Sequence, residues 1–205
     1  MSIYVVIYNN YMKLYIFIIF IGCVLTSILA VSVGTKVYSL SDGVILLSVL
    51  FSLLFLLFID ALVAIIVRLL PKRWMNPFNK IYTVHKWESK FYVRLGIRKW
   101  KDLIPESGKA LTGFGKREVV DMKDNVYLFK FMEETVYAEV MHIISAIFGF
   151  LVVIVNLKLW LIVGIPLAIF NFILQILPVM VQRYNRPKLM LAYKRNEKYN
   201  HSISK

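Results

Sequence analysis

Four apolar runs, each close to the length that crosses a bilayer, constrain this chain more than any other feature of its sequence. The runs cover residues 14–34, 44–70, 139–155 and 159–181. A helix needs about 20 apolar residues to span a hydrocarbon core of roughly 30 Å. With 59% hydrophobic residues and a mean hydropathy of +0.67, the chain is also too apolar for an ordinary soluble domain. We therefore expect an all-α, polytopic membrane bundle of about four transmembrane helices, forming a single membrane domain over residues 1–205.

The first apolar run predicts a membrane span that is not removed as a signal peptide. Residues 14–34 hold no charged residue, and the run is longer than the apolar segment of about 7–15 residues in a typical secretory signal. Small residues around Ala30 leave cleavage open as the alternative. We expect an uncleaved first span.

The hydrophilic segment between the second and third runs predicts a cytoplasmic loop. Residues 71–138 are dense in Lys and Arg, and such loops remain on the cytoplasmic side under the positive-inside rule. Four spans then place both termini, including the basic tail 183–205, in the cytoplasm. Aromatic residues that alternate with lysines early in the loop predict an amphipathic helix in the membrane interface.

The net charge of +13 indicates anionic partners. Anionic membrane lipids are favoured over nucleic acid because the basic residues lie beside the spans, where lipid phosphate is nearer. The only cysteine, Cys23, lies inside an apolar run, and His85 and His201 have no partners at metal-ligand spacing. We therefore expect no metal site and no bound cofactor.

Polar residues inside the spans predict contacts between helices. Asp60 lies deep in the second run, where a carboxyl group needs a partner or a proton; we expect a neutral acid that is hydrogen-bonded to a neighbouring helix. Asn171 and Gln175 are four residues apart and so present both amides on one helix face, toward other helices. Residues 156–158 predict a tight turn that joins the third and fourth spans as an antiparallel hairpin.

Two ionisable side chains stand at the entrance to the third span. Glu139 and His142 are three residues apart and share a helix face. Ionisable residues at membrane depth usually serve a function, and a histidine could act as general base while a carboxylate orients its imidazole. The alternative is that His142 anchors the helix at headgroup level and that Glu139 is solvated. Spacing alone favours neither interpretation.

A second pair of charged residues, Arg183 and Arg186, follows the fourth span, with Pro187 expected to end the helix. Guanidinium groups bind phosphate or carboxylate in a bidentate manner. The alternative is a positively charged flank that only fixes the orientation of the span.

Three stretches together resemble one family, the glycosyl-4,4'-diaponeurosporenoate acyltransferases, which are small bacterial membrane proteins of carotenoid glycolipid synthesis. The resemblance covers Phe91 to about Leu189. The stretches are Phe91-Tyr92 with the pattern RKWKD-L-P-E (Arg98, Lys99, Trp100, Lys101, Asp102, Pro105, Glu106), Glu134-Thr135 with Ala138-Glu139 and His142, and Gln182-Arg183-Tyr184-Asn185-Arg186-Pro187.

The resemblance implies transfer of a fatty acyl group to a sugar hydroxyl of a membrane glycolipid, the 6-hydroxyl of a glucosyl group in the carotenoid case. The co-substrate would be a cytoplasmic thioester, either acyl-CoA or an acyl carrier protein. His142 and Glu139 would be catalytic. The implied substrate-binding residues are Arg183, Tyr184, Asn185, Arg186, Arg98, Lys99, Trp100, Lys101, Asp102 and Glu134.

The sequence contains no GxSxG-like elbow and no reactive cysteine, so we expect direct transfer without an acyl-enzyme. A function of another class also fits the composition. It is a non-enzymatic membrane protein that binds anionic lipid or a partner enzyme through the basic loop, and it would require no particular residue at position 142.

Overall fold

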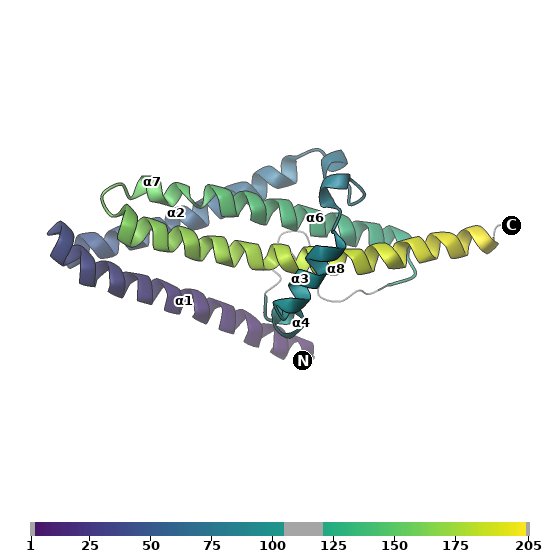
Figure 1. Ribbon diagram of the computed structural model, residues 1–205, viewed down its shortest axis with the longest axis horizontal. Coiled ribbons are helices and arrows are strands. Elements are labelled where there is room, and N and C mark those ends of the chain that lie inside the picture. Colours follow the sequence, from purple (N-terminus) through teal and green to yellow (C-terminus); the bar gives the residue numbers. More distant parts are fainter. Residues whose placement is uncertain (1–2, 105–120, 204–205) are drawn as a thin grey trace. The chain divides into compact units, whose positions relative to one another are not determined.

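The computed structural model describes residues 3–104 and 121–203. In those ranges every regular element is a helix, so the expected all-α class is confirmed (Figure 1). Four helices in the described part are long and apolar enough to cross a membrane, namely Ile16–Tyr38, Asp42–Leu69, Asn125–Val155 and Trp160–Ser202. The chain divides into two compact units, Met1–Ile66 with His142–Leu177 and Val67–Met141 with Pro178–Lys205.

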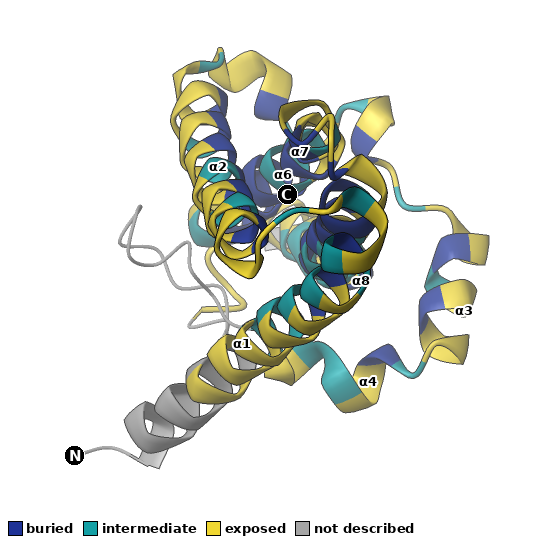
Figure 2. Ribbon diagram, turned by 90° about the vertical axis from the view of Figure 1, so that its left-hand side faces the viewer, coloured by how far each residue is buried: buried dark blue, intermediate teal, exposed yellow. Residues whose placement is uncertain are grey.

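The first unit contains two long apolar helices that expose most of their side chains. These are α1 (Ile3–Tyr38) and α2 (Asp42–Leu69), which ends just beyond the unit. Only 11% of the residues in the most apolar stretch of α1 and 22% of those in α2 are buried. Figure 2 shows exposed residues along both helices. Large exposed apolar surfaces are unfavourable in water, so these faces fit contact with lipid chains.

The core of the first unit is apolar and joins α1 and α2 to the hairpin of the third and fourth spans. The hairpin contains the end of α6 (Asn125–Phe148), α7 (Leu151–Val155), the π-helix η4 (Trp160–Gly164) and the start of α8 (Ile165–Ile203). The buried core residues are Ala30, Ile45, Val49, Leu56, Val152, Leu159, Ile162, Val163, Leu167 and Ala168.

A tight turn connects α7 to η4, as the sequence predicts. The Leu159 amide donates to the Asn156 carbonyl at 2.8 Å. The Asn156 side-chain amide donates to Ser52 Oγ of α2 at 2.7 Å and to the Val152 carbonyl at 2.8 Å. A Cβ on Gly164 would lie 2.9 Å from the Cα of Val153, so only glycine lets the two arms of the hairpin approach this closely.

The second unit contains the short helices of the predicted loop. They are η1 (Lys72–Met75), η2 (Lys80–Tyr82), α3 (Lys86–Arg94), α4 (Ile97–Trp100) and η3 (Lys101–Leu103). The helix α3 exposes Trp87 and Phe91 and buries Glu88 and Tyr92; its location in the membrane interface stays a prediction. Gly96 separates α3 from α4 at a φ of 69°, a left-handed conformation that favours glycine.

The long helices of the second unit differ from expectation at their ends. α6 begins at Asn125, inside the segment predicted as a loop, so the helix is longer than the predicted span 139–155. The expected end of the last helix at Pro187 is wrong, because α8 continues to Ile203. A proline inside a helix removes one backbone hydrogen bond. After Pro187, Leu189 packs against buried α6 residues, and this burial offsets the lost hydrogen bond. The buried cluster is Leu128, Phe131, Met132 and Leu189.

Candidate active site

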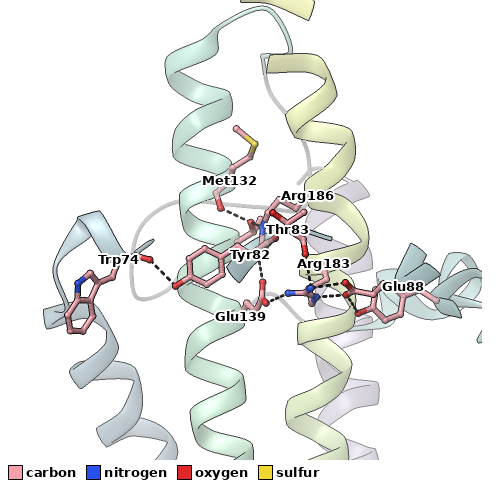
Figure 3. Close-up of polar contacts among 10 residues, drawn as sticks. Trp74, Tyr82, Thr83, Glu88, Met132, Glu139, Arg183 and Arg186 are labelled. Carbon is pink, nitrogen blue, oxygen red and sulfur yellow. Dashed lines mark hydrogen bonds and ion pairs between the residues drawn. The ribbon is translucent and has the colours of Figure 1, made fainter. Parts of the chain in front are cut away.

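Four of the predicted site residues, Glu139, His142, Arg183 and Arg186, lie in two polar clusters, one in each compact unit. The first is the arginine cluster of the second unit, which we define as Glu88, Glu139, Arg183 and Arg186 (Figure 3). The second is the histidine chain of the first unit, which we define as Asp60, Gln175 and His142.

Glu139 of α6 binds two arginines of α8 with its two carboxylate oxygens. Its Oε1 lies 2.5 Å from Nη1 of Arg183, and its Oε2 lies 2.5 Å from Nη2 of Arg186. The second contact lacks regular hydrogen-bond geometry, but opposite charges at this separation neutralise each other. The side chains of Glu139 and Arg186 are 3% and 1% exposed, so the pair is shielded from water.

Glu88 of α3 provides the second carboxylate of the arginine cluster. Arg183 donates to it from Nε at 2.8 Å and from Nη2 at 3.0 Å. The Tyr92 hydroxyl and the His85 amide also donate to Glu88, at 3.2 and 3.0 Å. Burial alone would raise the pKa of the Glu88 carboxyl, but these hydrogen bonds and the Arg183 charge hold it below its usual range. The cluster therefore contains two carboxylates and two guanidinium groups, with no net charge.

Arg186 is fully buried, and all three of its nitrogens are engaged. Besides the ion pair with Glu139, its Nε donates to Thr135 Oγ1 at 2.9 Å and its Nη1 donates to the Tyr82 carbonyl at 3.2 Å. The Tyr82 hydroxyl in turn donates to the Trp74 carbonyl at 2.9 Å, and burial together with the Glu139 charge raises the pKa of Tyr82. The phenol therefore remains a donor at neutral pH.

Two exposed cations contact Tyr184 of α8, and Lys99 follows one of them, Arg98, in the chain. Arg98 Nε donates to the Tyr184 hydroxyl at 3.2 Å, and Lys188 Nζ lies 4.0 Å from the centre of the Tyr184 ring. We call Arg98, Lys99 and Lys188, all of them exposed, the exposed cation group. The buried contact of Ile97 with Tyr184 holds α4 against α8.

The other predicted residues of the second unit lie in local contacts. Trp100 Nε1 donates to the Leu95 carbonyl at 3.0 Å, and Lys101 Nζ lies 2.6 Å from Asp102 Oδ1. Asn185 is half-buried on α8. Pro105 and Glu106 of the predicted motif lie outside the described residues.

Glu134, a predicted substrate-binding residue, forms an ion-pair cluster with two cations. Arg68 donates to both of its oxygens, at 3.1 and 2.7 Å, and Lys130 Nζ lies 3.1 Å from Oε1. The Arg68 guanidinium also lies 4.5 Å from the centre of the Tyr137 ring. Arg68, near the end of α2, thus has defined partners.

The histidine chain joins three helices in the first unit. His142 Nδ1 of α6 lies 2.6 Å from Gln175 Oε1 of α8. Gln175 Nε2 lies 2.7 Å from Asp60 Oδ2 of α2. This confirms the expectation that Asp60 and Gln175 contact neighbouring helices. The sequence did not indicate that both contacts belong to one chain ending on His142.

The structure therefore brings residues of all three stretches that resemble the family into the second unit, whereas His142 of the second stretch belongs to the first unit. Tyr92 and Arg98 of the first stretch, Glu139 of the second and Arg183 to Arg186 of the third share contacts there. Both oxygens of Glu139 are engaged by arginines, whereas Gln175 contacts Nδ1 of His142. Sequence reasoning missed Glu88, whose partner Arg183 lies 95 residues away in the chain, and Lys188, which contacts Tyr184 one helical turn earlier.

The profile of the family described as glycosyl-4,4'-diaponeurosporenoate acyltransferase matches residues 78–195, more than half of the chain. The chain belongs to this acyltransferase family. No curated protein and no solved structure matches it. Of the two functions compatible with the sequence, membership supports the enzyme, an acyltransferase of carotenoid glycoside type, over the non-enzymatic lipid-binding protein. The matched segment of this acyltransferase contains His142, Gln175 and the whole arginine cluster, but not Asp60.

Proposed function

We propose that this acyltransferase moves a fatty acyl group from a cytoplasmic thioester to a sugar hydroxyl of a membrane glycolipid, with His142 as general base. The observation that carries the proposal is the family match, which includes the Glu139 and His142 stretch. The half-buried position of His142 on α6, with Nδ1 held at 2.6 Å from an amide oxygen, supports a positioned base.

The reaction needs no covalent enzyme intermediate. The sugar hydroxyl oxygen attacks the thioester carbonyl carbon, and its proton passes to His142 Nε2. The new C–O bond remains as the carbon–sulfur bond breaks, and the proton on His142 then neutralises the leaving thiolate. The products are a glycolipid ester and a free thiol, and the imidazole returns to its neutral form.

The function is tested with purified protein in lipid nanodiscs, radiolabelled acyl-CoA or acyl carrier protein, and a panel of glycolipids that includes a glucosylated carotenoid carboxylate. We expect label in an ester on the sugar of one acceptor, with release of one thiol per ester. Thiol release without labelled glycolipid, or no reaction with any pair, would contradict the proposal.

The donor is expected to bind the exposed cation group. Arg183 and Arg186 are paired with Glu88 and Glu139, so Arg98, Lys99 and Lys188 offer the more accessible charge for CoA phosphates or an acidic carrier protein. In this proposal the arginine cluster maintains the fold that presents the exposed cation group.

Neutralising the exposed cation group is expected to weaken donor binding. The double variant Arg98→Gln, Lys188→Gln should raise the KM for the thioester by at least about tenfold, since even one charge-assisted contact contributes about 1.5–3 kcal/mol, with little change in kcat. Lys194→Gln, on the same helix and also exposed, is the matched control. Saturation curves for both donors that equal those of the control would exclude this group as the donor site.

Both termini and the segment 71–138 are expected to face the cytoplasm. In a Cys23→Ser background, a cysteine replacing the exposed Lys90 should resist an impermeant maleimide in intact cells and react after lysis. A cysteine replacing Leu157, which is 74% exposed in the turn after α7, should react in intact cells. The reversed pattern would show that the orientation is inverted.

A further inference from the structure

The histidine chain contains two residues to which the proposed reaction assigns no role, Asp60 and Gln175. Gln175 is 9% exposed, and Asp60 and His142 are half-buried. The two links of the chain are short, 2.6 Å from His142 Nδ1 to Gln175 Oε1 and 2.7 Å from Gln175 Nε2 to Asp60 Oδ2. Three helices thus bring an imidazole, an amide and a carboxyl group into one hydrogen-bonded chain.

The chemistry of these groups determines the direction of the chain. The NH₂ group of Gln175 donates to Asp60 Oδ2, and a carboxyl oxygen can accept this hydrogen bond through a lone pair in either protonation state. The carbonyl oxygen of the same amide must then face His142. An amide oxygen only accepts, so the proton of the neutral imidazole resides on Nδ1 and the ring lone pair resides on Nε2.

We propose that Gln175 and Asp60 are positioning residues that hold His142 in the Nδ1–H tautomer, so that Nε2 accepts the proton of the sugar hydroxyl. This inference rests on the proposed role of His142 as general base. When His142 becomes positively charged, the Gln175 oxygen and the Asp60 carboxylate behind it stabilise that charge. The arrangement serves the purpose that a carboxylate serves in a hydrolytic triad, with an amide placed between the carboxylate and the imidazole.

Asn171 of the same helix is an example of a buried amide that serves only packing. Asn171, four residues before Gln175, is also buried, and its side chain donates to the Ser145 backbone carbonyl at 3.5 Å. That contact is at the limit of a hydrogen bond and involves no ionisable group. Asn171 therefore provides the matched control for Gln175.

The test measures the tautomer of His142 directly, by ¹⁵N NMR of the full-length protein labelled at histidine. The chain has three histidines, and the signals of His142 are assigned by their loss in His142→Gln. We expect the Nδ1–H tautomer in the wild type and in Asn171→Leu. Gln175→Leu, which removes the acceptor, and Asp60→Asn, which no longer determines the amide orientation, should both increase the Nε2–H form.

We expect kcat to fall as the population of the Nδ1–H tautomer of His142 falls. Gln175→Leu is expected to lower kcat by about 10- to 100-fold, the usual range for residues that orient a functional imidazole, with the KM values unchanged. Gln175→Glu should retain more activity than Gln175→Leu, because a protonated glutamic acid can donate to Asp60 and accept from Nδ1. This conservative variant and Asp60→Asn also test the proposal if Gln175→Leu does not fold.

An unchanged His142 tautomer in folded Gln175→Leu and Asp60→Asn would overturn the inference and leave the two residues as packing contacts. The NMR measurement does not depend on activity. A tautomer shift in a protein that transfers no acyl group would therefore support the chain and contradict the proposed function, whereas normal acyl transfer with an unchanged tautomer would contradict the chain alone.

Discussion

Glu139→Gln is expected to destabilise the protein by about 3–5 kcal/mol, the typical loss when one partner of a buried ion pair is removed. The substitution keeps the size of the side chain but leaves Arg186, which is 1% exposed, without its counter-charge. Arg183 retains Glu88, so the loss falls mainly on Arg186. Thermal unfolding in detergent, followed by circular dichroism, should show a Tm about 10 °C lower.

Two further variants separate the ion pair from a general effect of substitution. Glu139→Gln combined with Arg186→Met should be more stable than Glu139→Gln alone, because no buried charge then lacks a partner. Glu133→Gln on the same helix breaks a pair with Lys130, whose side chain is 46% exposed, and should cost about 1 kcal/mol or less. A wild-type Tm for Glu139→Gln, or a double variant less stable than both single variants, would contradict the ion-pair account.

His142→Ala is expected to lower kcat by roughly 10²-fold or more, which is the usual contribution of a positioned acid–base group. The side chain is half-buried, so its removal should change Tm far less than Glu139→Gln does. The KM for the donor should not change, since His142 acts on the acceptor hydroxyl. Steady-state rates on equal amounts of folded protein measure this effect.

Glu139→Gln and His142→Ala also distinguish the roles of two residues that the sequence assigned to one catalytic pair. Spacing on one helix face suggested that Glu139 orients His142, whereas in the structure both Glu139 oxygens bind arginines. Loss of activity in Glu139→Gln should therefore parallel loss of folded protein. His142→Ala should instead lose activity while the protein remains folded.

The sequence predicted the transmembrane architecture because long apolar runs have few alternatives to a helix in lipid. It also predicted the turn at Asn156 and the inward-facing amides of Asn171 and Gln175. The continuation of α8 past Pro187 could not be predicted, because local proline rules favour a stop. The contacts that extend the helix pair Leu189 with α6 residues near Leu128, far away in the chain.

The site was predicted as a set of residues rather than as a set of contacts. Helical spacing identifies neighbours three or four residues apart, so it predicted that Glu139 and His142 share a helix face. The partners that the structure shows are distant in sequence: Glu88 lies 95 residues from Arg183, and Asp60 lies 115 residues from Gln175. Gln175 was noticeable in the sequence as an amide inside an apolar span, but nothing near it in the chain indicated Asp60 as its partner.

The most direct test of the central claim, that His142 is the base in acyl transfer to a sugar hydroxyl, is chemical rescue. Single-turnover transfer of a labelled acyl group to the glycolipid acceptor is measured in His142→Ala with and without added imidazole. The account predicts a rate about 10²-fold or more below the wild type, and a saturable increase when imidazole occupies the space left by the side chain. Transfer by His142→Ala at the wild-type rate without imidazole would contradict it.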